Sequence, residues 1–314
     1  MLQRICENEA AGLVQAARAG DSRTGARYTM AIVYEKLLNL AIPTIEQTYA
    51  PKDAMLYALG VGLGLDPMDR GQLDFVFEKN LKVLPTFAVV LAHPGLWVRD
   101  LDTGIDAVKV VHGEQGLILH RPLPSSGALI GRSRITGVVD KGEGRGALVM
   151  SERKISDHAT GELLATVTQT AFCRGDGGFG GPSGPSPKPH ELPMRNADFV
   201  CDLPTTPQAA LIYRLSADIN PLHADPDVAK AAGFPRPILH GLATYGVAGH
   251  AILKTVCDYD PTRLKALAGR FTAPVYPGET FRTGIWIDDG VASFRTTALE
   301  RNVVAISNGR AEFG

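Results

Sequence analysis

The sequence has 314 residues, enough for about two domains, and its 32 Lys and Arg residues nearly balance 33 Asp and Glu residues, for a formal net charge of −1. This balance, without a run of basic residues, argues against a nucleic-acid partner. The four cysteines form no CxxC pair and predict no disulfide framework. We find neither a secretory leader nor an apolar run long enough to span a membrane, and therefore expect no membrane partner and a cytoplasmic location if the source is bacterial.

The beginning of the chain divides into an irregular and a regular part. Residues 1–29 are rich in Ala and Arg and only weakly amphipathic, and we predict a disordered extension there. Residues 31–40 are expected to form a short helix or strand, and residues 45–50 a short strand. Residues 51–64 begin with Pro and carry an acid in the first turn, which is typical of a helix N-terminus. Their apolar body predicts a buried helix of a first domain.

Strand-like runs follow this helix at regular spacing, separated by turns that contain Gly, Pro, Asp or Ser. A helix followed by a series of such runs predicts an α+β domain with an antiparallel sheet. The expected strands cover residues 107–111, 117–121, 127–140, 146–155 and 163–173.

A change of composition marks the middle of the chain. Residues 174–195 contain six glycines and five prolines, which predicts a linker. We therefore place a first domain at residues 30–175, the linker at 176–195 and a second domain at 196–314.

The order of elements then recurs behind the linker. The second half is expected to contain a short strand, a turn-rich segment, an apolar helix and four more strands. These elements cover residues 197–202, 213–240, 241–257, 267–271, 279–288, 291–299 and 303–313. Because a helix precedes a strand series in both halves, we predict a duplicated domain, although the halves share almost no visible sequence identity.

Residues 213–241 carry the densest group of polar and turn-forming residues in the chain. The pairs at 220–221 and 225–226 each place an N-cap residue before a proline suited to the first helical position. Gly233 is placed to end the short helix that the second pair begins. A second helix is expected to begin near Gly241, after the last proline, and its apolar body indicates burial.

An acid and a histidine, Asp218 and His223, lie five residues apart in this segment. In one continuous helix they would be separated by about 500° of rotation, whereas a turn through Asn220 would let them converge. The helix that begins near Gly241 offers free backbone N–H groups and a positive dipole end. An acid, a base and an oxyanion site would then meet in one place. Taken alone, the two residues favour the simpler interpretation of a turn-capping Asp and a surface His, and only the full motif favours a catalytic pair.

The segment YRLSADINPLHADPDVAKAAGFPRPILHGLATYG resembles the signature of R-specific 2-enoyl-CoA hydratases, the hydratase 2 group of the MaoC-like dehydratases. Further matches are YALGVGLG at 57–64, LPTFAVVLA at 84–92, HGEQ at 112–115 and FTAPVYPGET at 271–280. The resemblance covers about residue 30 to the end. It implies a double hot-dog fold, with two antiparallel sheets each wrapped around a central helix. It also implies an acyl-CoA substrate, a homodimer, catalysis in the second half and acyl-chain binding in a non-catalytic first half.

The resemblance further implies a hydro-lyase that interconverts trans-2-enoyl-CoA and (3R)-3-hydroxyacyl-CoA. Asp218 and His223 match the family's catalytic dyad, which flanks one water, and the N–H of Gly241 matches its oxyanion donor. Asn220 caps the turn or orients the water. Glu78 matches a glutamate of the family pattern, and either supports the substrate or is a solvated surface residue. No cofactor is implied, since coenzyme A is part of the substrate.

Two questions stay open around this constellation. Coenzyme A carries phosphates, and Arg214, Arg236 and Arg270 all lie in or near the motifs, without a feature that selects one of them. His240 and Asp225 lie near the dyad in sequence and raise a metal site as an alternative. Metal ligands need convergent geometry, and the family pattern carries no metal, so we expect none.

Two other functions compete with the hydratase. A hot-dog thioesterase would share the fold and the acyl-CoA ligand, but it must aim water at the carbonyl carbon rather than at the β-carbon. A non-catalytic acyl-CoA-binding subunit would not need the acid and the histidine. The D-x-N-P-x-H motif favours the hydratase, and since the helix region of the first half lacks a histidine, we expect one active site per chain.

Overall fold

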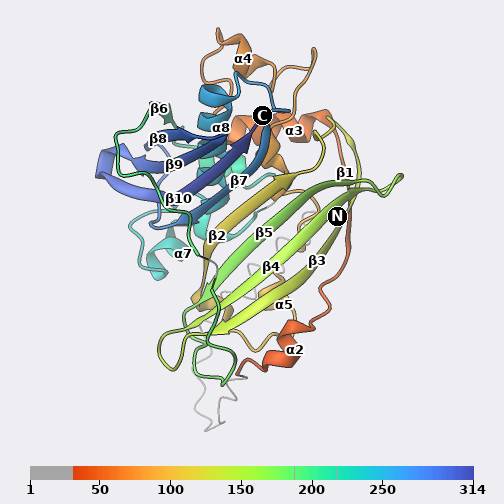
Figure 1. Cartoon of the computed structure of the whole chain (residues 1–314), viewed down its shortest axis with the longest axis vertical. Coiled ribbons are helices and arrows are strands. Elements are labelled where there is room, and N and C mark those ends of the chain that lie inside the picture. The colour runs from red at the N-terminus through yellow and green to blue at the C-terminus, as the bar shows by residue number, and fades with distance from the viewer. Residues whose placement is uncertain (1–30, 187, 217) are drawn as a thin grey trace. The chain divides into compact units, whose positions relative to one another are not determined.

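The computed structural model describes residues 31–186, 188–216 and 218–314. The prediction for residues 1–29 therefore lies outside the described residues. Residues 31–314 form one compact unit, and its described strands pair into a single ten-stranded sheet, with the spatial order β1-β3-β4-β5-β2-β7-β10-β9-β8-β6 (Figure 1). All described strand pairs are antiparallel.

The two halves of the sheet have the same strand order. The strands of the first half are β1 (Ile45–Tyr49), β2 (Val110–Leu119), β3 (Gly127–Asp140), β4 (Ala147–Asp157) and β5 (Leu163–Cys173). Those of the second half are β6 (Phe199–Pro204), β7 (Leu264–Phe271), β8 (Thr280–Asp288), β9 (Val291–Ala298) and β10 (Val303–Phe313). Each half runs first, third, fourth, fifth and second strand, and the halves meet where β2 pairs with β7. The double hot-dog fold is thus confirmed, with its two sheets joined edge to edge.

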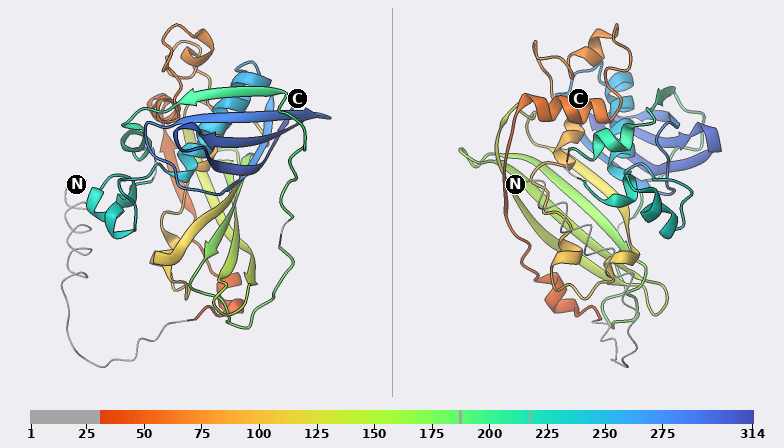
Figure 2. Two further views of the ribbon diagram at one scale, coloured as in Figure 1. Left: turned by 90° about the vertical axis from the view of Figure 1, so that its left-hand side faces the viewer. Right: turned by 180° about the vertical axis from the view of Figure 1, so that it is seen from behind.

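One long helix lies on the inner face of the second half. Helix α8 (Gly241–Val256) packs on β6, β7, β8, β9 and β10 (Figure 2). All its residues from Ala243 to Leu253 are buried, as the all-round apolar sequence predicts. The strands show the matching alternation: Phe281 and Ile285 of β8 are buried toward the core, whereas Arg282 between them is exposed.

The first half has a shorter centre. The predicted helix over 51–64 is observed as α3 (Pro51–Gly60) and ends there, because Gly62 and Gly64 adopt left-handed φ angles of +88° and +81°. A five-residue 3-10 helix, η1 (Pro85–Val89), packs instead on β2, β5 and α8. Smaller helices of this half are α2 (Tyr34–Leu38), α4 (Arg70–Leu73), α5 (Trp97–Asp100) and η2 (Ala107–Lys109).

Strand β2 corrects the prediction of two strands at 107–111 and 117–121. Residues 112–116 between them were not assigned to a strand, but they continue it across a bulge between His112 and Glu114. The polar residues are compatible with a strand here because β2 is the seam of the molecule, hydrogen-bonded to β5 on one side and to β7 on the other.

The second half also contains short helices, of which α6 (Ala209–Tyr213) precedes the turn-rich segment and η3 (Pro221–His223) and α7 (Pro226–Ala231) lie within it. A further short helix, η4 (Leu299–Arg301), lies between β9 and β10. Among the described residues, neither α8 nor a shorter helix has the length and hydropathy needed to cross a membrane.

Candidate active site

Two successive side-chain caps build the turn that carries the predicted dyad. The carboxylate Oδ1 of Asp218 accepts a hydrogen bond from the N–H of Asn220 at 3.0 Å. The side-chain oxygen of Asn220 then accepts one from the N–H of Leu222 at 3.1 Å and begins η3. Asn and Asp commonly reverse the chain in this way. The predicted capping role of Asn220 is therefore observed, and it brings the chain back toward Asp218.

The next helix follows the sequence prediction closely. Asp225 caps α7 by accepting hydrogen bonds from the N–H groups of Asp227 and Val228, at 2.8 and 3.4 Å. Gly233 follows the helix with a φ of +87°, a conformation that glycine adopts without strain. Asp225 is thus occupied by its cap, on the exposed side of the turn.

His223 is held as a neutral base. Its side chain is buried, and its Nδ1 lies 2.9 Å from the carbonyl oxygen of Ile238. A carbonyl only accepts, so Nδ1 carries the proton and Nε2 keeps a lone pair. Burial lowers the pKa of His223, which keeps the imidazole neutral near pH 7. Nε2 can therefore accept a proton from a water molecule.

The structure brings Asp218 and His223 together and adds a third residue, His240. One nitrogen or oxygen atom from each of the three residues lies within 4.8 Å of the other two. The rings of His223 and His240 stack at a centroid distance of 3.7 Å and an interplanar angle of 28°. Their lone pairs therefore lie in nearly parallel planes instead of pointing at one metal ion. This geometry favours a site for water, and the expectation that the site binds no metal stays a prediction.

His240 was not assigned a catalytic role by the sequence, although it lies directly before the helix that Gly241 begins. Its Nε2 donates to the backbone carbonyl of Asp218 at 3.1 Å, which anchors the acid's backbone. Burial, together with repulsion from His223, lowers the pKa of His240 to about 4. Its Nδ1 is buried and has no hydrogen-bond partner among the described residues. His240 is therefore uncharged, and it positions the backbone of Asp218.

Gly241 is the first residue of α8, as predicted. The N–H groups of Ala243 and Thr244 both donate to the carbonyl of His240, each at 3.1 Å, whereas that of Gly241 has no partner among the described residues. A methyl group on Gly241 would lie 3.5 Å from the ring of Phe271, an ordinary contact. A free N–H at the positive end of a 16-residue helix can bind a developing negative charge.

The first half also contributes to the walls of this site. The imidazole of His112, on β2, meets the ring of Phe271 edge to face at a centroid distance of 4.8 Å. Burial lowers the pKa of His112 to about 4, and the charge of Asp218 opposes this shift. No chemistry was predicted for His112 from the sequence.

Glu78, in contrast, is not brought to the dyad. It is exposed on the loop that follows α4. The residue before α4, Asp69, accepts a hydrogen bond from the hydroxyl of Tyr259 at 3.3 Å, just beyond the C-terminus of α8. A helix of 16 residues is about 24 Å long, so the α4 region lies at the opposite end of α8 from Gly241. The surface interpretation of Glu78 agrees with this placement.

The three arginines considered for coenzyme A differ in their contacts. Arg270 forms a salt bridge with Glu114, with its Nε at 2.9 Å, and is therefore neutralised. Arg214 donates to the carbonyl of Ile219 at 3.3 Å within the turn. Arg236 is exposed on the loop before α8, with its guanidinium 4.8 Å from the ring centre of Tyr276 and no carboxylate partner among the described residues.

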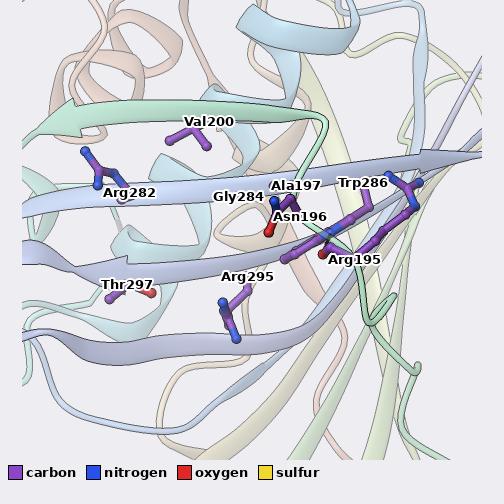
Figure 3. A pocket seen from close by; sticks show the side chains of 9 residues that line it. All are labelled: Arg195, Asn196, Ala197, Val200, Arg282, Gly284, Trp286, Arg295 and Thr297. Carbon is purple, nitrogen blue, oxygen red and sulfur yellow. Dashed lines mark hydrogen bonds between the residues drawn. The ribbon is translucent and has the colours of Figure 1, made fainter.

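A separate cleft of about 230 Å³ lies on the outer face of the second half (Figure 3). Two of its arginines are already neutralised by aspartates, Arg282 by Asp202 at 2.7 Å and Arg195 by Asp288 at 3.0 Å. Since side chains alternate between the faces of a strand, the cleft lies across the sheet from α8 and from the dyad. It is therefore not part of the candidate active site.

Comparison with known proteins assigns both halves. Residues 190–309 match the family described as MaoC like domain, and residues 47–175 match the MFE-2 hydratase 2 N-terminal domain. The peroxisomal enoyl-CoA hydratase 2 of Arabidopsis thaliana is 41% identical over 288 residues, which cover 86% of this chain and 92% of that protein.

Solved structures agree with this assignment. A MaoC-like dehydratase from Phytophthora capsici is 32% identical, with a TM-score of 0.79 and coverage of 89% of this chain and 98% of that chain. A Mycobacterium tuberculosis protein described as a double hot-dog fold is 16% identical, with a TM-score of 0.51 and coverage of 90% and 97%. The second likeness carries the fold alone.

Proposed function

We propose a specific hydratase activity for this chain, which is an enzyme and belongs to the MaoC-like family, within its hydratase 2 group. The reaction is the reversible hydration of trans-2-enoyl-CoA to (3R)-3-hydroxyacyl-CoA. The observation that carries the proposal is the convergence of the Asp218 carboxylate and the His223 imidazole beside the start of α8. These are the acid, the base and the oxyanion donor that the reaction needs.

In this proposal Asp218 and His223 hold one water between them. Nε2 of His223 accepts a proton as the water oxygen attacks the β-carbon of the enoyl thioester. The electron pair of the double bond then moves toward the thioester oxygen. One proton returns from the dyad to the α-carbon, so that water is added in full and the dyad is restored. The proposal assigns the two proton transfers to the pair as a unit.

The N–H of Gly241 stabilises the charge that develops on the thioester oxygen. Its support is the position of Gly241 at the first turn of α8, with an N–H that lacks an intrahelical partner. The ring of Phe271 lies directly beside Gly241 and keeps water from this side of the site. A backbone donor in such a surrounding is worth more than it would be in water.

The acyl chain is proposed to extend from the dyad into the first half. The short η1 at the centre of that half leaves several inner-face residues of the sheet partly exposed, among them Ser133, Ser151 and Gln169. His112 and Phe271 join the two halves at the site. We keep one active site per chain, because residues 31–175 of the first half, as far as the structure describes it, offer no pair equivalent to Asp218 and His223 near η1. The homodimer also stays a proposal, which a mass measurement by light scattering tests.

Turnover of crotonyl-CoA tests the proposed function against the thioesterase. A hydratase removes the absorbance of the enoyl thioester without releasing free thiol, and a thioesterase releases the thiol. Coupling the product to dehydrogenases specific for the R or the S alcohol then tests the configuration. Thiol release without loss of the double bond, or an S product, would contradict the proposal. Tight binding without turnover would indicate a non-catalytic acyl-CoA-binding protein.

A further inference from the structure

The inner face of the first half is interrupted by a band of polar residues. One apolar cluster contains Leu117, Ile155 and Val167, and a second, separate cluster contains Ile135 and Val149. Strand register places polar residues between them on the same face, and we call four of these the polar belt: Ser133, Ser151, Arg153 and Gln169. A hydrocarbon chain alone does not explain this belt, because apolar residues would line its path more favourably.

Arg153 is the charged member of the polar belt. Its side chain points inward, since its Nη2 donates to the carbonyl of Val89 in η1 at 2.6 Å. Only 6% of the residue is exposed. Its Nε has no hydrogen-bond partner, and no carboxylate pairs with the guanidinium, among the residues that the structure describes. Its cross-strand neighbours on β3 and β5 are Ser133 and Val167, which carry no charge.

A buried guanidinium without a counter-ion is costly. Burial lowers the pKa of Arg153 to about 10, so the group is still charged at neutral pH. The effective penalty for burying such an ion is several kcal/mol unless a partner and further hydrogen bonds offset it. The guanidinium donates one hydrogen bond to a carbonyl, and its Nε donates none to the described residues, so its hydrogen-bonding capacity is only partly used. An anion with two oxygens would meet the free edge of the guanidinium in bidentate fashion.

The belt is connected to the candidate active site. The helix η1, which holds Arg153 through a backbone carbonyl, also packs on α8. The hydroxyl of Tyr57 donates to the carbonyl of Thr86 in η1 at 3.0 Å. The ring centre of Tyr57 lies 5.7 Å from that of Tyr213, which in turn lies 5.0 Å from that of His240. Arg153 therefore faces the same interior as the dyad, on the side where the acyl chain is proposed to extend.

We propose that Arg153 binds a carboxylate at the far end of the acyl chain, so that the preferred substrates are ω-carboxy trans-2-enoyl-CoA esters. The inference rests on the proposed hydratase function and names its substrate class. The guanidinium forms two hydrogen bonds with the carboxylate, and Ser133 and Ser151 beside it supply further hydroxyl groups. The first apolar cluster, which contains Leu117, Ile155 and Val167, holds the methylene chain between the two polar ends.

Matched substrate pairs test the proposal. Hydration by the full chain is measured for a medium-chain to long-chain series of ω-carboxy trans-2-enoyl-CoA esters. Each is compared with the trans-2-enoyl-CoA of the same length whose chain ends in a methyl group, which we call the ω-methyl substrate. At the length that reaches Arg153, kcat/KM of the wild type is expected to be about tenfold to hundredfold higher for the ω-carboxy ester, the range of hydrogen bonds to charged groups. In Arg153→Met this preference disappears, whereas the ω-methyl substrate is hydrated within a few-fold of the wild-type rate.

Two further variants and one binding measurement complete the test. Lys154→Met, on the exposed face of the same strand, is expected to keep the preference, and Arg153→Lys to keep part of it. If Arg153 serves only to hold η1, the wild type shows no preference at any length and Arg153→Met lowers both rates equally, which overturns the proposal. An ω-hydroxy ester that performs as well as the ω-carboxy ester would also overturn it.

Binding to the wild type keeps the proposal testable if Arg153→Met does not fold. Saturated ω-carboxyacyl-CoA is expected to inhibit at about tenfold lower concentration than saturated acyl-CoA of equal length. Equal inhibition at every length would contradict the carboxylate site. If the wild type hydrates neither member of any pair, the hydratase function fails, and this binding comparison still decides the role of Arg153.

Discussion

At the level of single residues, hydrogen bonds to backbone carbonyls decide which nitrogen of each site histidine carries its proton. The carbonyl of Ile238 fixes the proton of His223 on Nδ1, and the carbonyl of Asp218 fixes that of His240 on Nε2. The sequence predicted the pairing of Asp218 and His223 because residue types alone indicate a turn through Asn220. It did not predict the stacking of His240 on His223, since that contact depends on how the loop before α8 returns to the turn.

Coenzyme A recognition is a prediction at this scale. We expect Arg236→Ala to raise KM for enoyl-CoA about tenfold with little change in kcat, because an exposed arginine that pairs with no carboxylate of the described residues is suited to a phosphate. Steady-state kinetics at low ionic strength measures this, with Arg295→Ala on the outer face as the matched control. An unchanged KM for Arg236→Ala would place the phosphates elsewhere.

At the level of elements, we propose that the start of α8 decides how the thioester oxygen is stabilised. His240, the residue before Gly241, has φ −58° and ψ 137°, angles that a residue preceding proline adopts readily. Gly241→Pro therefore removes the backbone N–H at a first-turn position without forcing the chain into a new conformation. We expect a folded protein whose kcat is lower by about 10² or more, with KM changed much less.

Gly241→Ala is the control for that variant. It keeps the N–H, and its methyl group meets the Phe271 ring at an ordinary 3.5 Å. Circular dichroism and single-turnover kinetics separate folding from chemistry in both variants. A folded Gly241→Pro protein that keeps most of its kcat would show that the oxyanion is held by another donor.

Elements also show where sequence analysis reaches its limit. Local signals predicted α7 and α8 closely, since capping residues and prolines define both helices. Strand β2 was divided in two, because its bulge and polar residues resemble a turn unless the partners β5 and β7 are known. The polar belt could not be predicted for the same reason, because its members share one face only through strand register, which is a tertiary property.

At the level of the whole molecule, we expect stability to depend on pH through several buried and half-buried histidines. Burial lowers the pKa values of His93 to about 3 and of His112, His240 and His250 to about 4. In the unfolded chain a histidine titrates near 6.5. The unfolded chain therefore binds protons first on acidification, and the stabilisation is complete above about pH 6.5 and is lost as the pH falls toward 4.

We expect the free energy of unfolding to fall as the pH is lowered from about 6.5 toward 4, by at most about 1.4 kcal/mol per pH unit for each such histidine. Denaturant titrations at a series of pH values in this window measure the slope. The aspartates with lowered pKa values lose their contribution to stability only below about pH 4, so they do not affect the slope measured in this window. A free energy that stays constant between pH 7 and 5 would show that these histidines are hydrated in the folded protein.

The turnover of dyad variants tests the proposed mechanism most directly. Initial rates of crotonyl-CoA hydration are measured for Asp218→Asn, His223→Ala and the double variant, with Asp227→Asn on exposed α7 as the control. Each single variant is expected to fold and to lose about 10²-fold to 10⁴-fold in kcat, the double variant to be little worse than the worse single, and the control to stay near wild type. Near-normal turnover in a folded Asp218→Asn or His223→Ala protein would contradict the assignment of this pair as the catalytic dyad.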